Sequence, residues 1–516
     1  MNVSTTPIDS LADLMNALAQ GEPRHLQLRT SILSPYSITL PPGFSLTGKD
    51  KDSCILSFSN GDGIGLTADN RVANMTLLAT PAARAIYTQT GLADMGSITL
   101  GDLAVTGQVS IIIRGGTRKL DLAVDNLHVA ACDCRRYSEQ PQKYGVNVYQ
   151  GALTVYNFNG DRNSIIHASL TNVTAGSRNA PVIGSGIFVS GFGDEGGWVE
   201  LDKLTTGAVY SNGMLPYGTA DIITAGVFIV FGVKARLVEH FGEIVTFGVN
   251  DMVLDTWGTV ENWLVHAPVV SYGPSGIGFV NFGTVDNFVA EREIVTHGLG
   301  ARGFNQYDGT VRSIRFHSIE TFGNGSIGIQ VSKPVGTIIV DKGITTHGSV
   351  GNTLVKGVNM QLPAAAFSVK SGGVVDKLAV GGDLITHGAD VTTYAVEGGR
   401  VNAIDVKGKI LAQGRNSNAI LVDHKGSTPL TNVRASAMAG KNLVVADGEV
   451  TDRTGLSARL QARRPLNGTT RWRCSPRPAM PSVTTSPAFS HCGGFMPSAT
   501  PGGVPVVMMS PGSSVM

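Results

Sequence analysis

Charged residues are scarce in this sequence, and neither sign of charge dominates. Asp, Glu, Lys and Arg make up 15% of the 516 residues, against roughly 25% in typical soluble domains. The 40 Lys and Arg residues balance 39 Asp and Glu residues, which leaves a net charge of +1. Proteins that bind nucleic acid or anionic membranes carry a basic excess. We therefore expect no nucleic-acid partner and no electrostatic membrane binding.

Paired cysteines and familiar catalytic motifs are also missing. The five cysteines are an odd number and form no C-x-x-C pair, which argues against a disulfide framework and against a zinc site. The chain has no G-x-x-x-x-G-K-[ST] phosphate loop, no G-x-S-x-G nucleophile motif and no H-E-x-x-H zinc motif. The sequence therefore predicts neither a metal site nor a cofactor.

Long apolar segments are absent as well. The N-terminal residues lack a basic stretch followed by an apolar run, so we expect no secretory signal peptide. The most apolar stretch begins at Ile223 and is shorter than the roughly 20 residues that a membrane-spanning helix needs. We expect no membrane span, and either a cytoplasmic location or export by a signal-independent route.

Glycine, by contrast, is abundant and recurs at a fixed interval. The 65 glycines are about 13% of the chain, against an average near 7%. A six-residue block, exemplified by EIVTFG and EIVTHG, recurs along the chain. It ends at Gly248, Gly273, Gly298, Gly323 and Gly348, at intervals of 25 residues, and once more at Gly388. A second block beginning G-T-V or G-T-I, and a third block rich in Val, Ile and Phe, keep step with the first.

These blocks predict three short strands per repeat, separated by glycine-marked turns. A parallel β-solenoid has this organisation, because each coil makes three corners and stacks its strands on the coil below. The predicted fold is all-β: a right-handed, single-stranded parallel β-helix. Helical spacing of apolar residues within residues 8–20 predicts a short helix that caps the first coil.

The predicted domain organisation has three parts. Residues 1–24 form the N-terminal cap, residues 25–455 the β-helix, and residues 456–516 a disordered tail rich in Pro, Ser and Gly. The tail contains nine of the 23 prolines, and after Ser457 it has arginines but no Lys, Asp or Glu. This charge pattern also raises the hypothesis that the tail is translated out of frame.

The N-terminal stretch HLQLRTSILSPYSITLPPGFSLTGKDKDSCILSFSNGDGIGL, followed by the repeats, resembles a known superfamily. It is similar to the right-handed parallel β-helix proteins that include pectate lyases, polygalacturonases and phage tailspike depolymerases. The resemblance covers most of residues 25–450 and is architectural, because no catalytic motif of the superfamily matches residue by residue. It implies a polysaccharide or oligosaccharide as the partner. Tailspike relatives are commonly trimers, so a homo-oligomer stays open.

The repeat also predicts which side chains stack. The second position of the six-residue block is always aliphatic and is expected to face the interior, together with the Thr or Ser at the fourth position. The fifth position is then an outward file of rings, with a spacing of about 4.8 Å. We expect it to fix the coil register or to form a sugar-binding platform. The file comprises Phe247, Tyr272, His297, Phe322, His347 and His387.

Polar residues of the third strand are the first candidates for chemistry. Asp255 and Asp308 are two coils apart, about 9.6 Å, near the roughly 6.5–9.5 Å between the carboxyl groups of an inverting glycosidase. The lengthened intervals after Gly176, Gly213 and Gly348 predict insertions at one corner, which could wall a groove. They add Asp194 and Glu195 as catalytic candidates. The predicted substrate-binding residues are Trp198, Tyr217, Asn281, Gln306, Arg302, Lys333 and Lys370.

Three functions are compatible with these residues. The first is polysaccharide hydrolysis, with Asp308 or Glu195 as general acid and Asp255 or Asp194 as base. The second is polysaccharide lyase chemistry, in which Arg302, Lys333 or Lys370 acts on an anionic sugar. The third is a non-catalytic solenoid that binds glycans or another protein at a surface. The same exposed acids also fit a solvated charge row, so enzymatic activity itself stays a hypothesis.

Overall fold

The computed structural model describes residues 5–355 and 358–456. These residues belong to one compact unit, which consists mainly of parallel strands, with two antiparallel hairpins and, among the described residues, a single helix. First and second strands of the coils belong to a sheet of 27 strands, and third strands to a sheet of 17. The prediction of an all-β parallel β-helix is confirmed. The predicted tail lies, from residue 457 onward, outside the described residues.

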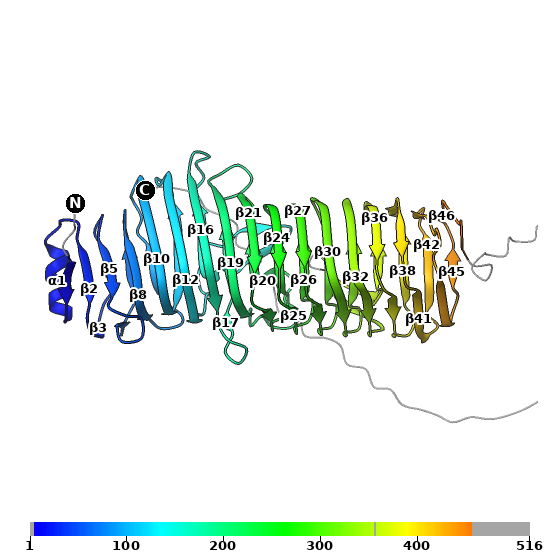
Figure 1. The fold of residues 1–516 in the computed structure, drawn as a ribbon, viewed down its shortest axis with the longest axis horizontal. Helices are drawn as coiled ribbons and strands as arrows, with labels where there is room; N and C mark the ends of the chain where they lie inside the picture. The colour runs from blue at the N-terminus through cyan, green and yellow to red at the C-terminus, as the bar shows by residue number, and fades with distance from the viewer. Residues whose placement is uncertain (1–4, 356–357, 457–516) are drawn as a thin grey trace, which may run out of the picture. The chain divides into compact units, whose positions relative to one another are not determined.

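Each regular coil contains three strands and about 25 residues. The coils stack side by side along the long axis in Figure 1. The central ones comprise β21 (Val233–His240), β22 (Ile244–Thr246) and β23 (Asp251–Thr256); β24 (Thr259–Val265), β25 (Val269–Ser271) and β26 (Ile277–Asn281); and β27 (Thr284–Ala290), β28 (Ile294–Thr296) and β29 (Arg302–Gln306). In the next coils the first two strands merge into β30 (Thr310–Thr321) and β32 (Val335–Thr346), followed by β31 (Ile327–Val331) and β35 (Phe367–Val369).

The N-terminal coils have longer strands. They include β10 (Asp94–Thr106), β12 (Lys119–Ala131), β16 (Ile165–Ala175) and β19 (Trp198–Asn212) in the large sheet, and β15 (Gly151–Phe158), β18 (Ser185–Ser190) and β20 (Ile222–Ile229) in the third-strand sheet. The cap is helix α1 (Leu11–Ala19), whose first turn is capped by the Ser10 hydroxyl accepting from the Asp13 N–H. A short strand, β1 (Thr5–Ile8), precedes the helix and pairs with β2 (His25–Leu28), which the sequence did not predict.

The repeat glycines are neighbours along the axis, as predicted. β22 pairs with β25 and β25 with β28 at a 25-residue register. A Cβ atom on Gly298 would lie 1.8 Å from the carbonyl oxygen of Gly273, and one on Gly323 would lie 2.0 Å from that of Gly298. No side chain fits at that distance, so this corner requires glycine in the coils of the 25-residue repeat.

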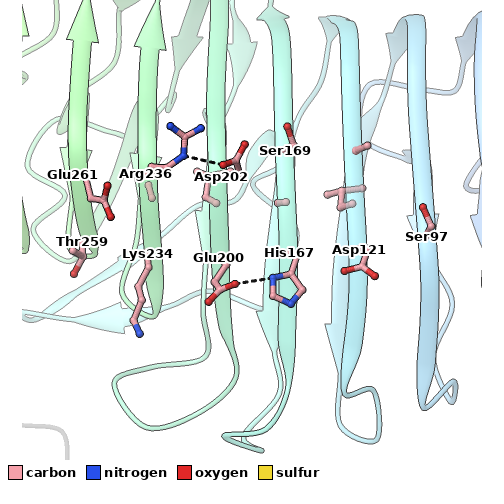
Figure 2. A pocket seen from close by; sticks show the side chains of 15 residues that line it. Ser97, Asp121, His167, Ser169, Glu200, Asp202, Lys234, Arg236, Thr259 and Glu261 are labelled. Atoms are coloured by element: carbon pink, nitrogen blue, oxygen red, sulfur yellow. Dashed lines mark hydrogen bonds and ion pairs between the residues drawn. The ribbon is translucent and has the colours of Figure 1, made fainter.

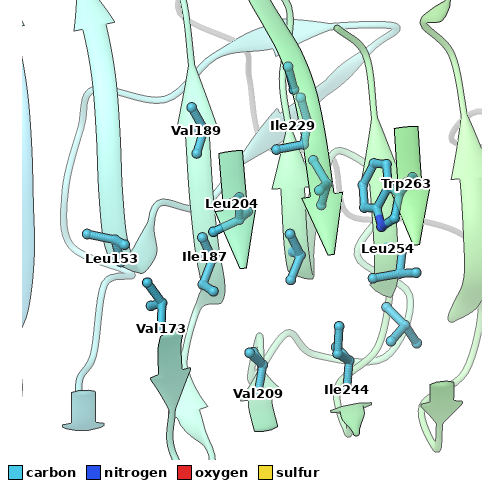
Figure 3. Close-up of a cluster of buried hydrophobic side chains, with 14 of the residues drawn as sticks. Leu153, Val173, Ile187, Val189, Leu204, Val209, Ile229, Ile244, Leu254 and Trp263 are labelled. Atoms are coloured by element: carbon cyan, nitrogen blue, oxygen red, sulfur yellow. The ribbon is translucent and has the colours of Figure 1, made fainter. Parts of the chain in front are cut away.

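The interior is filled by the predicted files. Ile244, Val269 and Ile294 are fully buried, and so are the hydroxyl residues Thr246, Ser271 and Thr296. Figure 3 shows part of this core, where Ile244 and Leu254 come from adjacent strands of one coil and Trp263 from the next. The apolar files hold the coils together because each buried aliphatic side chain contributes about 1.5–3 kcal/mol.

The outward rings form one continuous stack. Successive ring centroids from Phe247 to His387 are 4.5–5.4 Å apart, and the planes deviate by 10° or less. Each inner ring therefore contacts a ring on both faces and presents only its edge to solvent. A sugar stacks on the face of a ring, so this geometry favours the role in coil register over the role as a sugar platform.

Candidate functional site

The outer side of the third-strand sheet is buried, although it faces away from the interior. Phe279 packs in the main core, whereas its neighbour Val280 packs in a second, external apolar cluster. The register places Val280 in one file with Asp255 and Asn305 on adjacent coils, and all three side chains are at most 1% exposed. Side chains on the outside of a solenoid normally contact water, so something covers this file.

Insertions between the second and third strands cover it. Residues 132–150 contain β13 (Gln142–Lys143) and β14 (Val146–Val148), and β14 pairs with β20. The Tyr144 ring stacks on Phe282 at 4.5 Å and meets Trp257 edge-on at 5.4 Å. A hairpin of β33 (Val350–Val355) and β34 (Val358–Pro363) adds Val355 to the same apolar cluster. The insertions thus roof the third-strand sheet.

One part of the prediction about insertions needs correction. The turn after Gly176 lies against the second strands, because Arg178 pairs with Glu243 and lies over the Tyr210 ring. Asp194 and Glu195 lie at another corner, in the loop between β18 and β19. The insertions therefore do not share one corner: those at 132–150, 213–221 and 347–366 precede the third strands, and the loop at 191–197 follows one.

Asp255 is the most unusual group under this roof. Its side chain is completely buried, and neither carboxyl oxygen has a hydrogen-bond partner among the described residues. Burial raises the pKa of Asp255 well above its usual value; the nearby indole of Trp257 opposes the shift but makes no hydrogen bond to the carboxyl group. Asp255 lines a cavity of about 60 Å³ with Tyr144, Trp257, Phe282 and Tyr307. Burial therefore favours the protonated form of the acid that lines this cavity.

Other polar groups on the same outer face lack partners too. Arg302 is fully buried, and none of its three guanidinium nitrogens is hydrogen-bonded within the described part of the chain. Its guanidinium carbon lies 5.9 Å from the centroid of Tyr307, which lines the Asp255 cavity. Buried side-chain atoms of Asn305, Gln330 and Ser368 are also without partners among these residues. Such groups are costly unless water or a ligand satisfies them.

Two further carboxyl groups approach this cavity. The pKa of Tyr144 is raised to about 12, first by burial and then by repulsion from Asp308, Asp194 and Asp255. Asp255 and Asp308 are nevertheless not directly aligned. The register puts Asp255 in line with Asn305, so Asp308 lies two coils and three residues away, a Cα separation of roughly 14 Å. This exceeds the roughly 9.6 Å that the two-coil count alone predicted.

The remaining charged candidates form ion pairs at the edge of the roof. Asp308 and Lys333 are 3.5 Å apart, and Lys370 pairs with Glu397. Asp194 accepts from Lys143 at 2.9 and 3.1 Å. These side chains are partly exposed, and an oppositely charged partner balances each of them. Their charges therefore lie at the entrance of the cleft rather than inside it.

Glu195 and Trp198 line a separate corner groove. This open groove has a volume of about 510 Å³ and also includes Asp194 and Trp257. Glu195 pairs with Arg162, and the Lys234 ammonium lies 4.5 Å above the Trp198 ring. Trp257 lines both this groove and the Asp255 cavity. The corner groove is therefore adjacent to the covered cleft.

Three predicted substrate-binding residues do not face the cleft. Asn281 and Gln306 belong to an inward file, and their amides are hydrogen-bonded to each other and to backbone carbonyls. These hydrogen bonds close a corner of the coil. The alternation of polar and apolar residues along the strand did not predict this role. Tyr217 is 67% exposed and lines only a gap of about 20 Å³ between the 213–221 loop and the β33–β34 hairpin.

An open groove on the first strands was not predicted. It has a volume of about 560 Å³ and crosses β10, β12, β16, β19, β21 and β24. Figure 2 shows Asp121, His167, Glu200 and Lys234 in one row across its floor. The Nδ1 atom of His167 lies 2.8 Å from a carboxylate oxygen of Glu200. The alternation of polar and apolar residues in DLAVD and HASL indicates a polar outer face on these strands. The depth of the groove, however, does not follow from the sequence.

Within residues 5–355 and 358–456, no three His, Cys, Asp or Glu side chains lie close enough together to hold a metal ion. No helix in the same residues is long and apolar enough to cross a membrane. Comparisons with protein-family models, with curated proteins and with solved structures find no match to this chain.

Proposed function

We propose that the protein hydrolyses a polysaccharide in the cleft over the third-strand sheet, with Asp255 as the general acid. The observation that supports this proposal is a completely buried carboxyl group without a hydrogen-bond partner among the described residues, whose pKa is raised by burial and which lies beside Trp257 and a cavity. Glycosidases raise the pKa of the acid in this way and keep the partner carboxylate ionised. The resemblance to the pectate-lyase-like superfamily supports carbohydrate as the substrate class.

Hydrolysis needs an acid and a base. Asp255 donates its proton to the glycosidic oxygen as the bond to the anomeric carbon breaks, and an ionised carboxylate removes a proton from the attacking water. Asp308 and Asp194 are the candidates for this base, because each of them, like Asp255, contributes to the raised pKa of the Tyr144 hydroxyl. This reverses the roles expected from the sequence, because a group with a raised pKa is a poor base at neutral pH.

Substrate entry requires the roof to move. A cavity of about 60 Å³ holds only a few water molecules. The Tyr144 insertion closes it through ring contacts and one long hydrogen bond of 3.4 Å to the Phe282 carbonyl. Opening of this insertion would expose the Asp255 carboxyl and the Trp257 indole together.

A lyase reaction is the second candidate, and Arg302 favours it. Its buried guanidinium has no counter-ion among the described residues, which suits a carboxylate on an anionic sugar. Lys333 and Lys370 suit this role less well, because both are already paired with carboxylates.

The experiment is a polysaccharide panel assayed for new reducing ends and for the absorbance of unsaturated products. Hydrolysis gives reducing ends without that absorbance, and Asp255→Asn lowers kcat by about 10²–10⁴-fold. Asp376→Asn, on an exposed first strand, is the matched control and keeps wild-type activity. Unsaturated products would replace hydrolysis by the lyase reaction. Glycan binding without any product would support a non-catalytic binding protein instead.

A further inference from the structure

The open groove, the corner groove and the cleft are neighbours on the described part of the solenoid. The groove on the first strands and the corner groove share Lys234 and Thr259, and the corner groove shares Trp257 with the Asp255 cavity. The groove crosses six strands, which is about 24 Å at the usual strand spacing. The three spaces therefore lie in a row that is long enough for several sugar residues and runs from the first strands over the corner to the closed cleft.

The lining of the groove favours a neutral polymer. Its first row alternates along the axis as Asp121, His167, Glu200 and Lys234, and a second row runs through Asp202, Arg236 and Glu261. Neither row presents a single sign of charge. A polyanion would meet the carboxylates and a polycation the basic groups, whereas sugar hydroxyls donate to the first and accept from the second.

The ion pairs in the groove still have hydrogen-bonding capacity. Arg236 donates to Asp202 through one nitrogen, at 2.9 Å, and one oxygen of Glu200 lies 2.8 Å from His167. A guanidinium has five N–H donors and a carboxylate about four acceptor sites, so these two contacts leave most of them for a ligand. Ala123 and Ser169 continue the second row with small side chains, which keep that end of the groove open.

We propose that this groove binds a neutral, linear polysaccharide and directs it past Trp198 to the Asp255 cleft. The inference rests on the proposed function for its destination, but binding in the groove does not depend on catalysis. The groove would then hold the polymer on one face of the solenoid while the reaction takes place on another.

Native gels cast with soluble polysaccharides test this inference on the full chain. Pullulan, dextran and mixed-linkage β-glucan are the neutral probes, and carboxymethylcellulose is the anionic one. We expect at least one neutral polymer to retard the wild type. Ser169→Tyr, which fills the floor, and the double variant Glu200→Gln with Arg236→Gln each weaken that affinity about tenfold, the change that corresponds to about 1.4 kcal/mol.

Two further variants separate the groove from the catalytic proposal. Arg315→Gln removes an ion pair with Asp341 elsewhere on the same sheet and keeps wild-type retardation. Asp255→Asn also keeps it, so a failure of hydrolysis leaves the binding result intact. The inference is overturned if no neutral polymer retards the wild type, if only carboxymethylcellulose does, if both groove variants bind as the wild type does, or if Arg315→Gln loses as much affinity as they do.

Discussion

Charged side chains are paired with one another in the open groove, whereas those in the covered cleft are buried without a partner among the described residues. In the groove, Glu200 pairs with His167, and Asp202 with Arg236. Under the roof, Asp255 and Arg302 are fully buried, and neither side chain is paired among the described residues. A paired surface charge needs no ligand to explain it, whereas a buried unpaired group costs several kcal/mol. Burial without a partner, rather than charge itself, distinguishes the candidate catalytic region.

Asp251 sharpens this comparison, because it lies on the same strand as Asp255. It is also fully buried, but it accepts hydrogen bonds from the Thr224 hydroxyl and from the N–H groups of Gly213 and Gly248. Burial is the largest influence on its pKa, which rises to about 6, and these donors lower it only in part. The hydrogen bonds of Asp251 therefore hold the start of the 213–221 loop in place, whereas the carboxyl group of Asp255 makes no such bond among the described residues.

The largest expected effect comes from Asp255→Val. Burial raises the pKa of Asp255 in the folded protein above 3.8, its value in the unfolded chain. The folded state therefore retains a proton that the unfolded state releases, and the associated stability is present below pH 3.8 and is lost as pH rises through the folded pKa. Replacing an unpaired buried carboxyl by an apolar group should stabilise the protein at pH 8 by about 1–4 kcal/mol.

Denaturation midpoints of wild type and Asp255→Val, measured from pH 4 to pH 8, check this prediction. The two midpoints should diverge as pH rises. Asp376→Val, at an exposed position, serves as the control and should follow the wild type. Parallel pH profiles for wild type and Asp255→Val would mean that the carboxyl group has a partner or contacts bulk water, which would remove the contrast between the two regions.

The fold was predictable because its determinants are local and periodic. Gly273 and Gly298 recur every 25 residues since each corner brings two backbones into contact, and Ile244 and Thr246 alternate with the pleat. Such rules leave their trace in the sequence at every coil, so strand order, register and the ring stack all followed from it.

The site was predictable only in part. Asp255 was correctly placed on the outer side of the third strand, but its burial depends on Tyr144, which precedes it by more than a hundred residues and belongs to no repeat. The inward placement of Asn281 could not be foreseen either, because a local irregularity of the third strand puts two successive residues, such as Gly278 and Phe279, on the inner side. Contacts made by insertions have no periodic signature.

A smaller effect is expected from Tyr144→Ala, which tests the roof. The half-buried ring stacks on Phe282 and meets Trp257 edge-on, and aromatic pairs of this kind contribute about 0.5–1.5 kcal/mol beyond the area they bury. We expect the free energy of unfolding to fall by about 1–2 kcal/mol. We also expect tryptophan emission to shift to longer wavelength, since Trp257 becomes exposed. Tyr144→Phe keeps the rings and should change neither quantity. Unchanged emission in Tyr144→Ala would show that other groups close the cavity.

The smallest effect is expected in the groove. Glu200→Gln removes a carboxylate whose side chain is 46% exposed and paired only with His167, and surface substitutions of this kind change stability by about 0.5 kcal/mol or less. Its denaturation midpoint should match that of the wild type in low and in high salt, because a pair that contributes little has little to be screened. A large, salt-sensitive loss would mean that the groove pairs hold the coils together. The groove would then be a structural surface in the same sense as the glycine corners, and the weaker polymer binding of its variants would reflect a disturbed fold rather than lost contacts.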